Sequence, residues 1–319
     1  MTAAPGPSSI SFDPRLVEET VLLAERSFDP ATRGSFRRQR DRFYDLPDPD
    51  ERERRFASFH AEWFVRLELG IAIGQRLAEH PIFSGRPAPV SRCAVILANA
   101  ARDEGADLHE ERGPGNPSGR PALVIRLRPS TLLDPGRCTP LLRRDLLHVA
   151  DMLDPSFRYA PSPPAVEGGA TREKLVRDRY RVLWDLSVDG RLVSRGLLDN
   201  GVEQARKAEY LAAFGMPGPE AEGPFERLFR GPRPAHPELW AMACAAGGAG
   251  LCPLCRFPTP VLHPAAALLP QTLITAIRQE FPQWQPETGL CGHCADLYAS
   301  RPGRHTGSST VSCPNQTAH

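Results

Sequence analysis

Four cysteines in the second half of the sequence stand in two pairs that have the spacing of a metal site. Cys252 and Cys255 form one C-x-x-C pair, and Cys291 and Cys294 form the other. Each pair can place two thiolates on one metal ion, and two pairs complete a tetrahedral set of four sulfur ligands. The spacing therefore predicts a structural Zn²⁺ site in a small domain that depends on the metal for much of its folding energy.

The second pair, C-G-H-C, also has the sequence of a dithiol redox site. That chemistry needs a buried strand before the motif and most of a thioredoxin-like fold around it. Here residues 282–290 (PQWQPETGL) precede the pair and only 25 residues follow Cys294, so a structural metal is the preferred prediction. Cys244 is either a spare ligand or a small buried residue.

A second group of candidate residues lies on a predicted helix over residues 141–155. Arg144, Asp145 and His148 read R-D-x-x-H, where the helical H-E-x-x-H motif of zinc peptidases has two histidine ligands and a glutamate base. A guanidinium cannot lose its proton, so Arg144 cannot be a ligand and would repel a dication. Asp145 would take the place of the glutamate base, with a side chain that is one methylene shorter. The degenerate motif argues against catalysis.

Together with a predicted helix over residues 171–189, this motif resembles the zincin class of metallopeptidases. In one branch of that class a later helix carries W-N-x-A-x-D, whose last acid is taken as the third metal ligand. Residues 184–189 (WDLSVD) match that stretch at the tryptophan and at the final aspartate. The resemblance covers roughly residues 90–200. It implies Asp189 as the third ligand, with Asp185 one helical turn away on the same face.

Asp154 is an alternative third ligand. It stands ten residues after Arg144, where a second zincin pattern places a ligand beyond a glycine turn. Asp151 occupies the glycine position of that pattern, and a left-handed turn is costly for a residue other than glycine. Asp189 is therefore preferred.

The same residues also allow a purely structural interpretation. His148 can be a hydrogen-bonded residue of the core or its edge, and the acids Asp185 and Asp189 can form ion pairs with arginines. A guanidinium can balance buried carboxylates in the place where a zinc ion would otherwise do so. The candidate arginines are Arg144, Arg177 and Arg181.

Helices and a small sheet must position these residues. Apolar periodicity predicts helices over residues 14–26, 34–44, 51–69, 71–79, 141–155, 171–189 and 197–214, and strands over residues 90–98, 105–111 and 122–127. The helix over 141–155 is expected to start at Thr139-Pro140 and to end at Asp154-Pro155. The order of elements predicts an α+β fold, with a zincin-like domain of helices and a small sheet.

The length and composition indicate one larger and one smaller domain. The expected limits are a flexible leader over 1–11, a zincin-like α+β domain over 12–215, a linker over 216–235, a zinc-binding domain with four cysteine ligands over 236–300 and a disordered tail over 301–319.

The formal net charge of the chain is +1, so no bulk field favours nucleic acid or a membrane surface. The arginines around the cysteine pairs are dispersed, whereas a nucleic-acid surface needs clustered cations. No secretory signal and no membrane-spanning run stand out. We therefore expect a soluble, cytoplasmic protein whose partner is a protein or peptide.

The expected function is that of a catalytically inactive, metallopeptidase-like protein, a pseudoenzyme that acts as a binding or scaffold protein and carries a zinc ribbon. One alternative is a zinc-dependent hydrolase with a reduced site. It would use His148 and Asp189 as ligands of a second Zn²⁺ and Asp145 as the base. A further alternative is a zinc-ribbon protein that binds nucleic acid.

Overall fold

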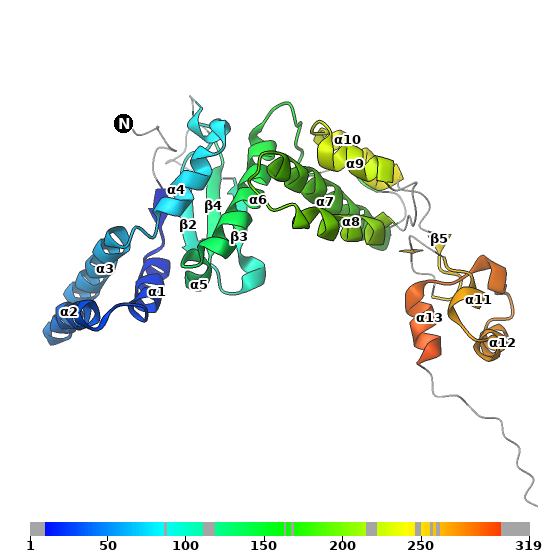
Figure 1. The fold of residues 1–319 in the computed structure, drawn as a ribbon, viewed down its shortest axis with the longest axis horizontal. Helices are drawn as coiled ribbons and strands as arrows, with labels where there is room; N and C mark the ends of the chain where they lie inside the picture. Colours follow the sequence, from blue (N-terminus) through cyan, green and yellow to red (C-terminus); the bar gives the residue numbers. More distant parts are fainter. Residues whose placement is uncertain are drawn as a thin grey trace, which may run out of the picture.

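The computed structural model describes residues 10–85, 88–110, 119–162, 164–166, 169–214, 222–245, 250–255, 258–259 and 262–300. The fold is mostly helical with a small four-stranded sheet, so the α+β prediction is confirmed (Figure 1). Within the described ranges, no helix combines the length and the apolar character that crossing a bilayer requires. Most of the expected leader and the whole tail from 301 lie outside these ranges.

The sheet has the strand order β1-β2-β4-β3. Its strands are β1 (Ile10–Phe12), β2 (Cys93–Leu97), β3 (Gly105–His109) and β4 (Ala122–Leu127). The first, second and fourth run parallel, and β3 pairs antiparallel with β4 at one edge. One expectation is corrected, because the first strand begins inside the predicted leader.

Three of the helices that precede β2 share one start signal. The helices before β2 are α1 (Pro14–Glu25), α2 (Pro30–Asp41), α3 (Pro49–Arg66) and α4 (Ile71–Ala78), with the short 3-10 helices η1 (Arg42–Asp45) and η2 (Pro81–Ser84). In α1, α2 and α3 an aspartate caps the helix and a proline takes its first position. The carboxylate accepts an otherwise unpaired backbone N–H, and proline has no N–H to leave unpaired.

The same signal starts the helix that carries Arg144. A 3-10 turn, η3 (Ala101–Asp103), and a short helix, α5 (Pro129–Leu132), precede α6 (Pro135–Leu153). Asp134 caps α6 and accepts a hydrogen bond from the backbone of Arg137. The expected start at Thr139-Pro140 is therefore wrong, because Pro140 lies inside the helix. The expected end is confirmed, since Asp154 is already in the extended region before Pro155.

The helices after α6 pack around one long helix. They are α7 (Gly169–Ser194), α8 (Gly201–Phe214), α9 (Glu222–Arg230) and α10 (His236–Ala245), and α8, α9 and α10 all contact α7 (Figure 1). Residues 222–230, which lie inside the expected linker, form a regular helix whose Phe225 and Phe229 are buried. Phe225, Phe229 and Trp240 share one hydrophobic cluster with Leu183 of α7.

The residues from 250 onward form their own hydrophobic cluster. Its elements are β5 (Gly250–Leu251), β6 (Pro258–Thr259), α11 (Ala265–Leu268), α12 (Gln271–Glu280), the 3-10 helix η5 (Pro286–Thr288) and α13 (Gly292–Ala299). Leu269, the residue before Pro270, is extended, so α11 ends before the proline and α12 starts after it. The second cysteine pair lies at the start of α13, where Cys291 is the N-cap residue.

Candidate functional site

The four cysteines of the two C-x-x-C pairs converge. Each offers a sulfur atom, and the four atoms lie within 4.8 Å of one another. Cys252 Sγ is 3.8 Å from Cys294 Sγ, and Cys255 Sγ is 3.8 Å from Cys291 Sγ. A zinc ion bound at about 2.3 Å by four sulfurs separates them by about 3.8 Å, the edge of the tetrahedron. The described cysteines are all free thiols, and the donor set fits a zinc ion.

Backbone N–H groups prepare these sulfurs to carry negative charge. The N–H of Cys291 donates to Cys252 Sγ, and the N–H of Cys294 donates to Cys291 Sγ, both at 3.4 Å. Burial opposes ionisation of Cys252, but the surrounding N–H groups outweigh burial and lower its pKa to about 7. Burial and the neighbouring thiols raise the pKa of Cys294. Four thiolates therefore need a cation among them.

The second candidate site is built on the packing of α6 against α7. Arg144 forms a two-bond ion pair with Asp189, in which Nε donates to Oδ1 at 2.7 Å and Nη2 donates to Oδ2 at 3.0 Å. Arg206, from α8, donates to the same Oδ2 at 2.6 Å. The Asp189 side chain is completely buried. One carboxylate thus holds two guanidinium groups from two helices.

His148 lies one turn further along α6 and pairs with the other acid. Its Nε2 is 2.9 Å from Asp185 Oδ1, and its ring meets the Trp184 ring edge to face at 4.6 Å. Burial opposes ionisation of Asp185, but the hydrogen bond from His148 and the charges of Arg206 and Arg144 hold its pKa below its ordinary value. The imidazole nitrogen that faces Asp185 is therefore already engaged.

Asp145 differs from the other acids of this site because no arginine of the described residues forms an ion pair with it. Burial raises its pKa to about 6, against the smaller opposing effects of His148 and of the backbone N–H of Ala106. Gly105, at the start of β3, lets the carboxylate come close. A Cβ atom there would lie 3.0 Å from Asp145 Oδ2, and the φ of +151° is one that other residues rarely adopt.

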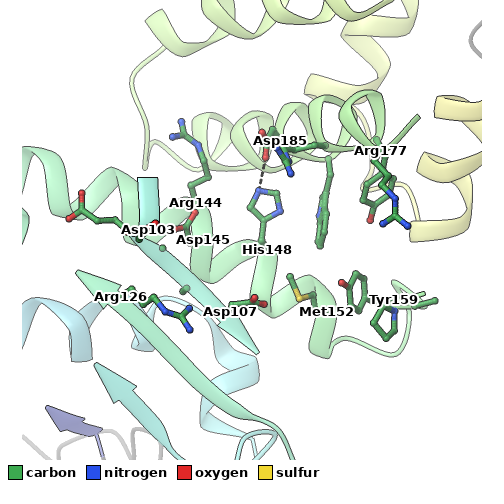
Figure 2. Close-up of a pocket in the computed structure, with 18 of the residues that line it drawn as sticks. Asp103, Asp107, Arg126, Arg144, Asp145, His148, Met152, Tyr159, Arg177 and Asp185 are labelled. Atoms are coloured by element: carbon green, nitrogen blue, oxygen red, sulfur yellow. Dashed lines mark ion pairs between the residues drawn. The ribbon is translucent and has the colours of Figure 1, made fainter. Parts of the chain in front are cut away.

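These side chains border a cavity of about 680 Å³ between β3, α6 and α7. Arg144, Asp145 and His148 face it from α6 and Asp185 faces it from α7 (Figure 2). Asp189 does not line the cavity, whereas its partner Arg144 does. The guanidinium therefore stands between the buried acid and the open space.

Asp154, the alternative ligand, belongs to a different network. Its Oδ2 accepts a hydrogen bond from Arg233 at 2.6 Å. Asp151 accepts hydrogen bonds from Arg191 and Arg233 and from the Trp184 indole at 2.9 Å. This network ties α6 to α7 and to the segment that leads into α10. The geometry favours Asp189 over Asp154 as the acid that faces Arg144.

The structure thus brings together all five residues singled out on the two helices: Arg144, Asp145, His148, Asp185 and Asp189. Four of them form an ion-pair network with Arg206, and Asp145 lies beside that network. Over the described residues, the cysteine cluster is the only group of three or more potential metal ligands close enough to hold an ion. Arg206 escapes prediction from sequence, because nothing local in α8 indicates that it reaches Asp189.

Of the other arginines considered, Arg177 forms an ion pair with Glu173 rather than with Asp185 or Asp189. Cys93 and Cys138 are buried in the core of the first half. Cys244 packs beside the cluster around α7 and is not part of the cysteine site.

No protein-family model, no curated protein and no solved structure matches this chain. The resemblance to zincins therefore stays a prediction that rests on residues 144–148 and 184–189.

Proposed function

We propose that this chain is a non-catalytic, metallopeptidase-like binding protein. Its cleft receives a segment of a partner protein, and its four cysteines hold a structural zinc ion. The observation that carries the proposal is the two-bond ion pair between Arg144 and Asp189. A permanent cation occupies the position where an active relative would need a neutral ligand.

Charge explains why a second metal is not expected in the cleft. Two guanidinium groups already neutralise Asp189, and Asp185 is engaged by His148 and lies 3.5 Å from Arg206 Nη1. A dication placed there would meet repulsion from Arg144 and would have to displace charge-assisted hydrogen bonds. In this network the arginines neutralise the carboxylates, as a bound metal ion would do in an active metallopeptidase.

The shape of the cleft supports a role in binding. The cavity is large enough for several side chains, and Gly105, Ala106 and Asp107 of the edge strand β3 border it. An edge strand can add an extended peptide through backbone hydrogen bonds, while the neighbouring cavity selects side chains. This combination favours a peptide partner over a small soluble metabolite.

The second candidate is a zinc-dependent hydrolase with a reduced site. One observation favours it, namely that Asp145, whose pKa is raised to about 6, and His148 border the same cavity. A carboxylate with such a pKa can act as a general base near neutral pH. The number of metal ions per chain separates the two candidates.

The test is metal stoichiometry, measured by mass spectrometry on protein purified without added chelator. We expect about one zinc per chain in the wild type, almost none in Cys252→Ser and an unchanged content in His148→Ala. About two zinc ions in the wild type, with a loss of one in His148→Ala, would overturn the proposal in favour of the hydrolase.

A double variant, Arg144→His with Asp145→Glu, tests the lineage implied by the motif. It restores two histidines one turn apart and frees Asp189 Oδ1, so we expect it to bind one additional zinc ion. The matched control is Arg143→His with Asp145→Glu, which puts the new imidazole one residue out of position. Equal metal content in the two double variants would contradict the interpretation of Arg144 as a replaced ligand.

A further inference from the structure

One end of the cavity is walled by aromatic rings. Tyr159, Tyr180, Trp184 and Trp240 all border it. The ring centres of Tyr159 and Trp184 are 5.8 Å apart, those of Tyr180 and Trp184 are 5.6 Å apart, and those of Tyr180 and Trp240 are 5.7 Å apart. The rings therefore form one continuous apolar surface rather than isolated contacts.

The polar atoms of two of these rings are held by groups that do not line the cavity. The Tyr180 hydroxyl is hydrogen-bonded to His236 Nδ1 at 2.7 Å, and the Trp184 indole N–H donates to Asp151 at 2.9 Å. His236 and Asp151 are buried. These bonds fix both ring planes, and the rings contribute mainly carbon surface to the cavity. An apolar group that enters the cavity meets a wall that is already ordered.

Positive charge lies beside this aromatic wall. Arg177 and Arg181 stand one turn apart on α7, and both are exposed and border the cavity. Arg177 and Tyr159 lie at the same end of the cavity (Figure 2). Arg177 shares its charge with Glu173, while Arg181 has no ion pair with any other residue of the described ranges. A guanidinium next to a desolvated apolar site favours an anionic group on the ligand.

We propose that this end of the cleft is a recognition site for an aromatic side chain followed directly by an acidic residue in a partner peptide. The aromatic ring packs against the surface formed by Tyr159, Tyr180 and Trp184, and the acid meets Arg181. This proposal names the ligand of the binding function proposed above and rests on it. It goes beyond that function because the site uses none of Arg144, Asp145 and His148.

The test uses the full-length, zinc-loaded chain and four synthetic peptides. The parent probe is acetyl-Gly-Gly-Phe-Glu-Gly-Gly-amide, and the others replace Phe by Ala, Glu by Gln, or Glu by Lys. Binding is measured by calorimetry and by the fluorescence of the chain's own tryptophans, since two of them border the site. We expect the parent to bind most tightly, with affinity about tenfold or more lower without the ring and about tenfold lower with Lys.

A charge reversal on the protein makes the test specific. Arg181 is exposed, so Arg181→Glu should leave the fold intact, which circular dichroism checks. We expect this variant to prefer the Lys peptide over the Glu peptide. The matched control is Arg54→Glu, an exposed arginine of α3 that does not border the cavity, and it should keep the wild-type preference.

A random hexapeptide library, screened in parallel on the wild type, distinguishes failure of this recognition site from failure of the proposed binding function. Binders without a preference for an aromatic–acidic pair, and unaffected by Arg181→Glu, would overturn this site but leave the binding function standing. An absence of any binder, in the library and among the four probes, would overturn both.

Discussion

Asp189 is fully buried and accepts hydrogen bonds from both Arg144 and Arg206. A carboxylate removed from water is costly unless it is paired, and a second cation on the same group needs a second acid nearby. Asp185, one turn earlier on α7, supplies that acid and also engages His148. The four charges therefore depend on one another, and removing a single partner leaves an uncompensated buried charge, at a cost of about 3 to 5 kcal/mol in comparable pairs.

Asp145 gives a prediction with a defined pH dependence. Burial raises its pKa from 3.8 to about 6 in the folded chain, so the folded state binds its proton more tightly than the unfolded state. The cost of burying the charge is full above about pH 6 and disappears as pH falls toward 4. We expect Asp145→Asn to raise the free energy of unfolding by about 1 to 3 kcal/mol at pH 7.5, and by almost nothing at pH 4.

Urea unfolding of both proteins between pH 4 and pH 8 measures this difference. The matched control is Asp107→Asn, since Asp107 borders the same cavity but is exposed, and this change should have little effect at any pH. A difference between wild type and Asp145→Asn that grows as pH falls would contradict the assigned environment of Asp145.

At the scale of elements, the contact between α7 and α9 depends on one glycine. Gly190 lies where the backbone of α9 approaches α7, and a Cβ atom there would overlap the carbonyl oxygen of Phe229. Backbone cannot yield as the end of a flexible side chain can. We expect Gly190→Ala to lower the free energy of unfolding by about 3 kcal/mol or more, measured by urea denaturation.

Gly74→Ala is the matched control for this helix contact. Gly74 also lies inside a helix, α4, but a Cβ atom there would sit 3.9 Å from Ile10 Cδ1, an ordinary contact distance. Alanine favours the helical state, so this variant should gain about 0.5 to 1 kcal/mol. Equal effects of the two substitutions would mean that α9 does not pack against α7 as described.

Local signals are sufficient to predict much of the fold. Apolar periodicity indicates α1 and α7, and β4 is predicted at its observed limits. The start of α6 is mispredicted because Pro140 resembles a first helical residue, although Asp134-Pro135 carries the same cap that starts α1. The helix α9 escapes prediction because glycines and prolines around it resemble a linker, while its burial depends on the distant α7.

The candidate site is predictable where the chemistry lies within one helix or one cysteine pair. Arg144 and His148 are four residues apart, and their meeting with Asp189 and Asp185 follows from the resemblance. The hydrogen bond from Arg206 to Asp189 does not follow from the resemblance, because it depends on how α8 packs against α7. The aromatic wall is likewise not predictable, since Tyr159 and Trp240 come from segments about 80 residues apart.

At the scale of the whole molecule, the hydrophobic residues fall into separate clusters. Among the described residues, the cluster around Trp284 contains none before Cys252, whereas Phe225 and Trp240 belong to the cluster around α7. This division favours a domain boundary after α10, later than the predicted linker. For a cluster this small, we expect that folding depends on a metal ion bound by the four cysteines.

Metal removal should therefore act on one part of the chain. We expect a zinc chelator to release about one equivalent of zinc and to abolish hydrogen-exchange protection in α12 and α13, while α6 and α7 keep theirs. Cys252→Ser should reproduce this state, and Cys244→Ser should retain zinc and protection as the matched control. Loss of protection in α6 on chelation would contradict an independent metal-dependent unit.

The double pairing of Asp189 also has an evolutionary consequence. If Arg144 is substituted alone, the buried Asp189 keeps only one of its two arginine partners. If Asp189 is substituted alone, the guanidinium groups of Arg144 and Arg206 repel each other. Each single substitution passes through a less stable protein, so drift cannot dismantle the arrangement one step at a time. Relatives of this chain should therefore keep Arg144, Asp189 and Arg206 together or lack them together.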